Sequence, residues 1–89
     1  MSAIQKIIRG AYFLSVENLP WVVGHRELGK YFSKFGPIAE AKVVFDGKTG
    51  ISTSKGYVHF VDLNGYSRAL NQRNHRLEGH VLRVKANDD

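Results

Sequence analysis

Three side chains able to contact a ligand alternate along one short stretch of the sequence. Lys55, Tyr57 and His59 occupy every second position, with apolar Val58 and Phe60 between and after them. Because successive side chains of a β-strand point to opposite faces, this spacing predicts one core face and one face that carries a cation, an aromatic ring and an imidazole. Such rings stack on nucleic-acid bases while cations contact phosphates. An ordinary solvated strand is the alternative that this stretch alone leaves open.

The charge balance of the whole chain also favours a polyanionic partner. Its 89 residues include 13 Lys and Arg against 8 Asp and Glu, giving a formal charge of +5 and an isoelectric point near 9.8. A field of this sign favours nucleic acid first and an anionic membrane surface second. No apolar run approaches the length of a membrane span, so we expect a soluble protein without membrane association. Without cysteine the chain has no disulfides and no thiolate metal sites, and its length suits one domain.

Residues 1–10 form a basic segment with an amphipathic pattern. Ile4 and Ile7 share one helical face, Lys6 and Arg9 lie elsewhere, and the segment contains no acidic residue. This composition resembles a very short mitochondrial targeting segment. A flexible basic tail is the alternative.

Alternating patterns predict four strands, at residues 11–19, 38–45, 53–60 and 80–86. We place the more apolar set of each strand toward the core, because a strand with one buried face keeps its apolar side chains on that face. With this assignment, alternate side chains point away from the core, and eight of them are candidate contact residues: Phe13, Ser15, Lys42, Lys55, Tyr57, His59, Arg83 and Lys85. Other outward positions are Glu17, Val44 and Val81.

Two stretches between the strands have helical periodicity. Apolar residues recur at spacings of three, four and seven in the first one, which Gly36 and Pro37 end. Its core residues are Leu28, Tyr31, Phe32 and Phe35. Asp62 can cap the second helix through its carboxylate, and a polar loop is predicted at residues 71–76. The buried stripe of this second helix comprises Leu63, Tyr66, Ala69 and Leu70.

The predicted order of elements is therefore βαββαβ. The right-handed crossover rule closes this order into a ferredoxin-like α+β sandwich, in which a four-stranded antiparallel sheet carries both helices on one face. The first and third strands form the central pair, and the other face of the sheet stays uncovered. We assign residues 11–86 to this domain, residues 1–10 to the N-terminal tail and residues 87–89 to a short C-terminal tail.

An enzyme is a further interpretation, since small phosphatases can share this order of elements. No glycine-rich phosphate-binding loop opens a helix in this sequence. The histidines have neither metal-ligand spacing nor an evident carboxylate partner, and we expect each of them at the surface: His25, His59, His75 and His80. We therefore expect no catalytic residue, no metal, no cofactor and no small-molecule substrate.

Two of the predicted strands carry a family signature. The hexamer Leu14 to Leu19 and the octet Thr53 to Phe60 stand where the RNA-recognition motif has its first-strand and third-strand signatures, and the loop Asp46 to Gly50 has the usual spacing before the octet. Residues 11–86 as a whole resemble this family. The resemblance implies the fold above and RNA binding through the uncovered face of the sheet.

Three positions depart from the contact pattern of that family. Thr53 stands where a basic residue usually meets phosphate, Lys55 where an aromatic residue contacts sugar or base, and Ser15 where a ring stacks. Of these contact positions, Tyr57 keeps its ring. Stacking is worth roughly 1 to 3 kcal/mol per base, so we expect modest, salt-sensitive and weakly sequence-specific RNA binding.

Further segments have closer counterparts inside the family: Leu19 to Trp21, Leu28 to Gly36, Phe45 to Gly50, Gly56 to Phe60 and Ala69 to His75. In these segments the chain resembles the small mitochondrial stem-loop-interacting RNA-binding proteins. This resemblance implies a protein of the mitochondrial matrix; the nucleus or the cytoplasm is the alternative location. It implies binding to single-stranded or stem-loop RNA, such as mitochondrial messenger RNA. It also implies a leucine-rich pentatricopeptide-repeat protein as partner, in a complex that stabilises messenger RNA and supports its polyadenylation and translation.

A protein-binding module that no longer binds RNA directly is the alternative function. In this hypothesis Phe13, Val44 and Tyr57 form an apolar dock for a peptide, and the losses at Ser15 and Lys55 favour it. The net charge of +5 and the outward cations oppose it, because a peptide dock has no need of so many cations on one sheet. RNA binding remains the first prediction.

Overall fold

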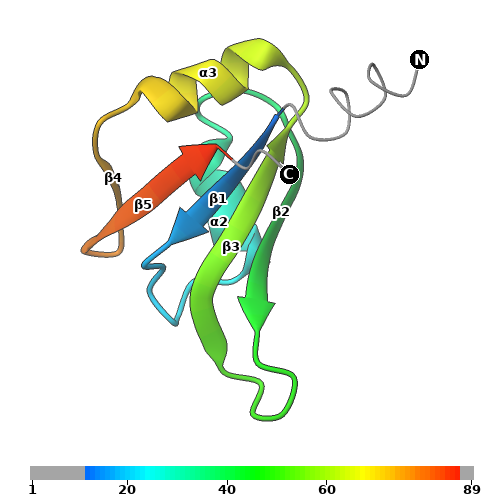
Figure 1. Ribbon diagram of the computed structural model, residues 1–89, viewed down its shortest axis with the longest axis vertical. Coiled ribbons are helices and arrows are strands. Elements are labelled where there is room, and N and C mark those ends of the chain that lie inside the picture. Colours follow the sequence, from blue (N-terminus) through cyan, green and yellow to red (C-terminus); the bar gives the residue numbers. More distant parts are fainter. Residues whose placement is uncertain (1–11, 87–89) are drawn as a thin grey trace.

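The fold is a two-layer α+β sandwich, described for residues 12–86 by a computed structural model (Figure 1). Its elements are β1 (Phe13–Glu17), α2 (His25–Phe32), β2 (Ile38–Phe45), β3 (Ser52–Phe60), α3 (Leu63–Asn71), β4 (His75–Leu77) and β5 (His80–Ala86). The sheet is antiparallel with strand order β2-β3-β1-β5-β4, so β1 and β3 pair directly, as predicted. The tails predicted at residues 1–10 and 87–89 lie outside the described residues.

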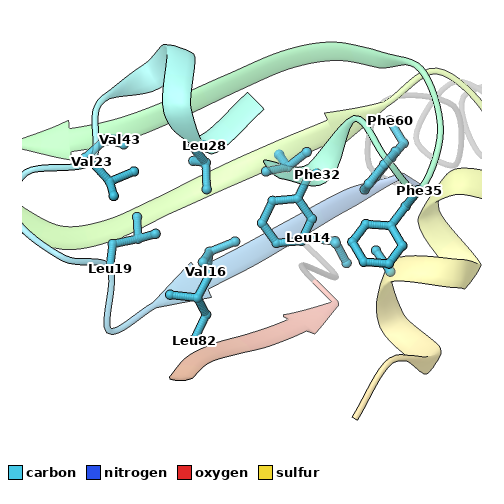
Figure 2. Packing of buried hydrophobic residues seen from close by; sticks show 12 residues of the cluster. Leu14, Val16, Leu19, Val23, Leu28, Phe32, Phe35, Val43, Phe60 and Leu82 are labelled. Atoms are coloured by element: carbon cyan, nitrogen blue, oxygen red, sulfur yellow. The ribbon is translucent and has the colours of Figure 1, made fainter. Parts of the chain in front are cut away.

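The apolar core lies between the sheet and both helices (Figure 2). Leu14 of β1, Phe60 of β3 and Phe32 of α2 are fully buried in it, and Ala69 of α3 joins the same cluster. Burying one such large side chain stabilises the fold by roughly 1.5 to 3 kcal/mol. The helices therefore cover one face of the sheet, and α2 lies behind the strands in Figure 1. Within residues 12–86, neither helix is long and apolar enough to cross a membrane.

The first helix is shorter than predicted. It ends at Phe32 rather than at Gly36, because the chain tightens into turns in which the Phe35 amide donates to the Phe32 carbonyl and the Gly36 amide to the Ser33 carbonyl. Phe35 is nevertheless buried, at 8% exposure. The prediction that these aromatic residues form the core is confirmed.

The buried stripe of α3 differs from the prediction at its first residue. Leu63 is 56% exposed. It is the first residue of α3 and follows Asp62, whose carboxylate caps the helix by accepting a hydrogen bond from the Gly65 amide at 3.0 Å. Gly65 and Ala69 are instead the buried residues of this helix. The predicted Asp62 cap is confirmed.

The short strand β4 replaces part of the loop predicted at residues 71–76, so the sheet has five strands instead of four. It pairs with β5 from His75 to Leu77. Glu78 and Gly79 connect the two strands with φ values of 50° and 81°, the positive values that a two-residue hairpin turn requires. The sequence did not predict β4, because this strand has three residues and lies in a mostly polar stretch.

Two backbone features shape β3, the strand at the centre of the predicted site. A Cβ atom on Gly56 would lie 2.5 Å from the carbonyl oxygen of Lys42, so only glycine lets β2 and β3 approach this closely. Ser54 has a φ of 65°, and the β2–β3 register shifts beside Val44. Such irregularities bend a strand and redirect its side chains. β3 therefore bends just before Lys55, the residue at which its regular pairing with β2 begins.

Candidate nucleic-acid interface

The eight predicted contact residues lie on four strands, on the face of the sheet that the helices leave uncovered. This outer face is arranged in cross-strand rows that the register defines. Its middle row runs from Lys42 on β2 through Tyr57 and Ser15 to Lys85 on β5. The partly exposed ring of Tyr57 therefore has Lys42 beside it on one side, and Ser15 followed by Lys85 on the other. A base stacked on Tyr57 would place its flanking phosphates within reach of these cations.

The aromatic end of the outer face lies where β1 begins and β3 ends. Phe13 and His59 are register partners whose rings stack with centroids 4.2 Å apart and planes inclined by 11°. Phe13 also approaches Tyr57, with a centroid separation of 5.8 Å and an angle of 57°. The three rings form a continuous cluster, so His59 covers part of the Phe13 ring and Phe13 supports Tyr57.

The opposite end of the outer face is charged. Its row contains Val44, Lys55, Glu17 and Arg83. An Arg83 Nη1 atom lies 3.6 Å from Glu17 Oε1. A second exposed pair, between Lys42 Nζ and Glu40 Oε2 at 3.8 Å, lies beside the middle row. Exposed pairs of this kind contribute roughly 0 to 1 kcal/mol to stability, so each cation remains able to exchange its carboxylate for a phosphate.

Sequence reasoning left these two carboxylates out of the site. Strand alternation placed Glu17 outward, although not among the contact residues, and it could have placed Glu40 there too, because Glu40 alternates in step with Lys42. They lower the net positive charge of the surface. They also repel phosphates from the positions beside them.

A pocket of about 700 Å³ opens at the charged end of the sheet, where β1 finishes and β3 and β5 begin. The residues around it that carry charge or a hydroxyl group include Glu17, Thr53, Lys55, Arg73 and Arg83. Arg73 belongs to the connection between α3 and β4 and was not predicted as a site residue. Its place beside β5 depends on the path of that connection, which no strand or helix periodicity reveals.

His75 was expected at the surface, and this expectation is wrong, because the residue is only 2% exposed. Its Nε2 lies 2.7 Å from the Ala69 carbonyl oxygen and its Nδ1 lies 2.8 Å from the Tyr31 hydroxyl. A carbonyl only accepts, so Nε2 carries the proton and Nδ1 accepts from Tyr31. Burial lowers the pKa of His75 and the nearby Lys34 ammonium adds to this, although the Ala69 hydrogen bond opposes it. The imidazole therefore serves as a neutral internal link between the two helices and β4.

The other histidines have separate surroundings. His25 is exposed at the start of α2, and its Nδ1 accepts a hydrogen bond from the Val43 amide at 2.8 Å. His80 is exposed at the start of β5, while His59 belongs to the ring cluster. In the part of the chain that the structure describes, no group of three or more His, Cys, Asp or Glu side chains could hold a metal ion.

An antiparallel sheet whose outer face, within residues 12–86, is free of helices and carries rings and cations defines a class of nucleic-acid-binding module. Residues 14–83 match the RNA recognition motif family, and the chain belongs to this family. The solved structure titled "Crystal Structure of RNA Binding Protein PG1" superimposes with a TM-score of 0.81 at 28% identity, covering 88% of this chain and 95% of that one. The predicted fold class is confirmed.

Within the family, the chain is similar to the mitochondrial SRA stem-loop-interacting RNA-binding proteins. It is 34% identical over 70 residues to that of Bos taurus, covering 79% of this chain, and 32% identical over 71 residues to that of Mus musculus, covering 80%. The match spans 63% of the length of each relative. The resemblance seen in the sequence is therefore confirmed.

Proposed function

We propose that this chain binds single-stranded or stem-loop RNA through the outer face of its sheet. The observation that carries this proposal is the middle row, in which Tyr57 lies between Lys42 and Lys85 with Ser15 beside it. The ring supplies a stacking surface for one base, and the lysines supply contacts to its flanking phosphates. Membership of the RNA recognition motif family supports the same function.

The intrinsic affinity is modest in this proposal. Tyr57 is one platform where the family uses several, Phe13 is partly covered by His59, and Glu17 and Glu40 offset part of the positive charge. Phosphate contacts then supply much of the binding free energy. We expect the affinity to fall steeply with salt, because each phosphate contact releases counterions.

A titration of the Tyr57→Leu variant with short single-stranded RNA tests this function. Removing the ring weakens binding about five- to 150-fold, the range for loss of one stacked base. The matched control is Trp21→Leu, which removes an aromatic residue that is 74% exposed but lies in the turn after β1. Equal affinities for the two variants would contradict the proposal.

We also place this function in the mitochondrial matrix, in a complex with a leucine-rich pentatricopeptide-repeat protein that stabilises messenger RNA and supports its polyadenylation and translation. The mitochondrial designation of the relatives supports the location. A partner that holds the RNA explains how a module with one exposed stacking ring could act, because tethering raises the effective concentration of RNA at a weak site.

Two measurements test this placement. A tagged full-length chain should resist protease in intact mitochondria and lose that protection when both membranes are lysed. The purified chain should also bind the repeat protein and raise its affinity for messenger RNA. A protein recovered outside mitochondria would contradict the location, and a repeat protein whose RNA affinity does not respond to the chain would contradict the partnership.

A protein-docking function remains the second candidate, because the outer face carries two carboxylates and exposed apolar side chains. Val44 is 46% exposed and Val81 is 45% exposed. The substitution Val44→Ser distinguishes the two functions, because it removes apolar surface and leaves every cation in place. RNA binding predicts an unchanged RNA affinity for this variant, whereas peptide docking predicts that the variant no longer binds its protein partner.

A further inference from the structure

The pocket at the charged end of the sheet is built from segments that hydrogen bonds fix in place. Asn18 Nδ2 donates to the Val81 carbonyl at 2.9 Å and ties the end of β1 to the start of β5. The Leu19 amide donates to the Ser54 carbonyl at 3.0 Å and ties the same end of β1 to β3. These hydrogen bonds fix the relative positions of the three strand ends that line the pocket, with Lys55 on β3 and Arg83 on β5.

Thr53 lines this pocket at the position where the family usually has a basic residue that meets phosphate. Its hydroxyl donates to the Val44 carbonyl at 2.8 Å, so the side chain is used within the sheet. The pocket nevertheless contains three cationic side chains, those of Lys55, Arg73 and Arg83. The positive charge missing at position 53 is thus supplied by cations at other positions, on β3, on β5 and on the connection after α3.

These cations are not equivalent. Arg83 lies 3.6 Å from the Glu17 carboxylate, which lines the same pocket. Within residues 12–86, neither Lys55 nor Arg73 takes part in an ion pair. A phosphate entering the pocket would be repelled by Glu17 and attracted most by the two cations without a carboxylate partner.

The connection that carries Arg73 has hydrogen-bonded residues on both sides of the arginine. The preceding Gln72 donates from Nε2 to the Asn74 carbonyl at 3.1 Å. Two residues after Arg73, the buried His75 ring is fixed by the Ala69 carbonyl and the Tyr31 hydroxyl. The buried imidazole thus anchors the segment that brings a guanidinium to the edge of the pocket.

We propose that this pocket binds a phosphodiester group of RNA through Lys55 and Arg73, in place of the basic residue that the family has at position 53. This inference rests on the RNA binding proposed above and names the contact that extends the footprint beyond Tyr57. Glu17 lies between Lys55 and Arg83 in the charged row and pairs with Arg83, so Lys55 and Arg73 are the cations left to bind the phosphate. A guanidinium suits this role because its planar donors match phosphate oxygens in pairs.

The variants Arg73→Gln and Lys55→Gln test the proposal in RNA titrations at several salt concentrations. Each should weaken binding about fivefold, as for removal of one exposed ionic interaction. The slope of log affinity against log salt should become shallower by about 0.7 for each phosphate that the variant no longer neutralises. Arg68→Gln is the matched control, because Arg68 is an exposed arginine on α3 that does not line the pocket. Amide spectra of the variants establish that each is folded.

RNA with a single uncharged methylphosphonate linkage, moved one position at a time, locates the phosphate that the pocket binds. One linkage position that weakens binding to the unsubstituted chain should weaken binding to Arg73→Gln less, whereas the linkages that Lys42 and Lys85 contact should weaken binding to both proteins equally. If Tyr57→Leu impairs binding while Arg73→Gln and Arg68→Gln have the same affinity and salt slope, the pocket proposal is wrong and the RNA function stands. If the unsubstituted chain binds no RNA at all, both proposals are wrong.

Discussion

The ring of His59 stacks on that of Phe13 across the central strand pair, with 4.2 Å between their centroids. These two residues are direct register partners, so the stack fills the aromatic end of the outer face. Phe13 also touches Tyr57, which links the stack to the ring proposed to receive a base. The outer face thus has an aromatic end that supports Tyr57 and a charged end that contains the pocket.

A double-mutant cycle on Phe13→Leu and His59→Leu should detect this stack. We expect a coupling of about 0.5 to 1.5 kcal/mol in the free energy of unfolding, the usual range for an aromatic pair. Urea denaturation of the four proteins measures it. Additive effects of the two substitutions would mean that the rings do not interact in solution.

Replacing His75 should destabilise the protein through its hydrogen bonds. His75→Leu leaves the Ala69 carbonyl and the Tyr31 hydroxyl without their buried partner, and we expect a loss of about 1 to 3 kcal/mol in the free energy of unfolding. His80→Leu is the control, because His80 is exposed. Comparable stabilities for the two variants would contradict the role assigned to the buried ring.

The same histidine should make stability depend on pH. The folded protein lowers the pKa of His75 below its ordinary value of 6.5, so the unfolded chain binds the proton more readily. The contribution is fully present above pH 6.5 and is lost as the pH falls through the lowered folded pKa. The stability difference between the unsubstituted chain and His75→Leu should therefore shrink on acidification from pH 8 to about pH 5. A difference that stays constant over this interval would contradict the assignment.

A methyl group at Gly56 should disrupt the sheet. The added Cβ would lie 2.5 Å from the Lys42 carbonyl oxygen and 3.1 Å from Leu28, so β2 and β3 would have to separate. We expect Gly56→Ala to lower the free energy of unfolding by about 1 to 3 kcal/mol or more. For Gly47→Ala no described atom lies within 4 Å of the new methyl, and this control should unfold like the original chain.

Sequence patterns predicted the fold well where one physical signal dominated. β2 and β5 have the predicted bounds because turn-forming residues mark where they begin and end: Pro37 and Asp46 flank the first stretch, and Gly79 precedes the second. α2 ended early and β4 was missed, since a tight turn after Phe32 and a hairpin with three paired positions leave little periodicity to read. Leu63 was misplaced because helical spacing cannot tell whether the first turn reaches the core.

The sequence predicted which side chains of the candidate site share the outer face, but not how they are arranged on it. Parity placed Phe13, Tyr57 and Lys55 on the same side of the sheet. Their division into an aromatic end and a charged end depends on cross-strand register, which the sequence of one strand does not contain. Arg73 could not be predicted, because only the folded connection after α3 brings it to the pocket.

The most direct test of RNA binding is an amide chemical-shift titration of the labelled chain with short single-stranded RNA at low and moderate salt. We predict shifts for Tyr57, Lys55 and Arg83 on the outer face, reduced at the higher salt concentration, while the helix residues stay unchanged. If these outer-face amides do not respond at millimolar RNA, the sheet is not an RNA-binding surface and the account is wrong.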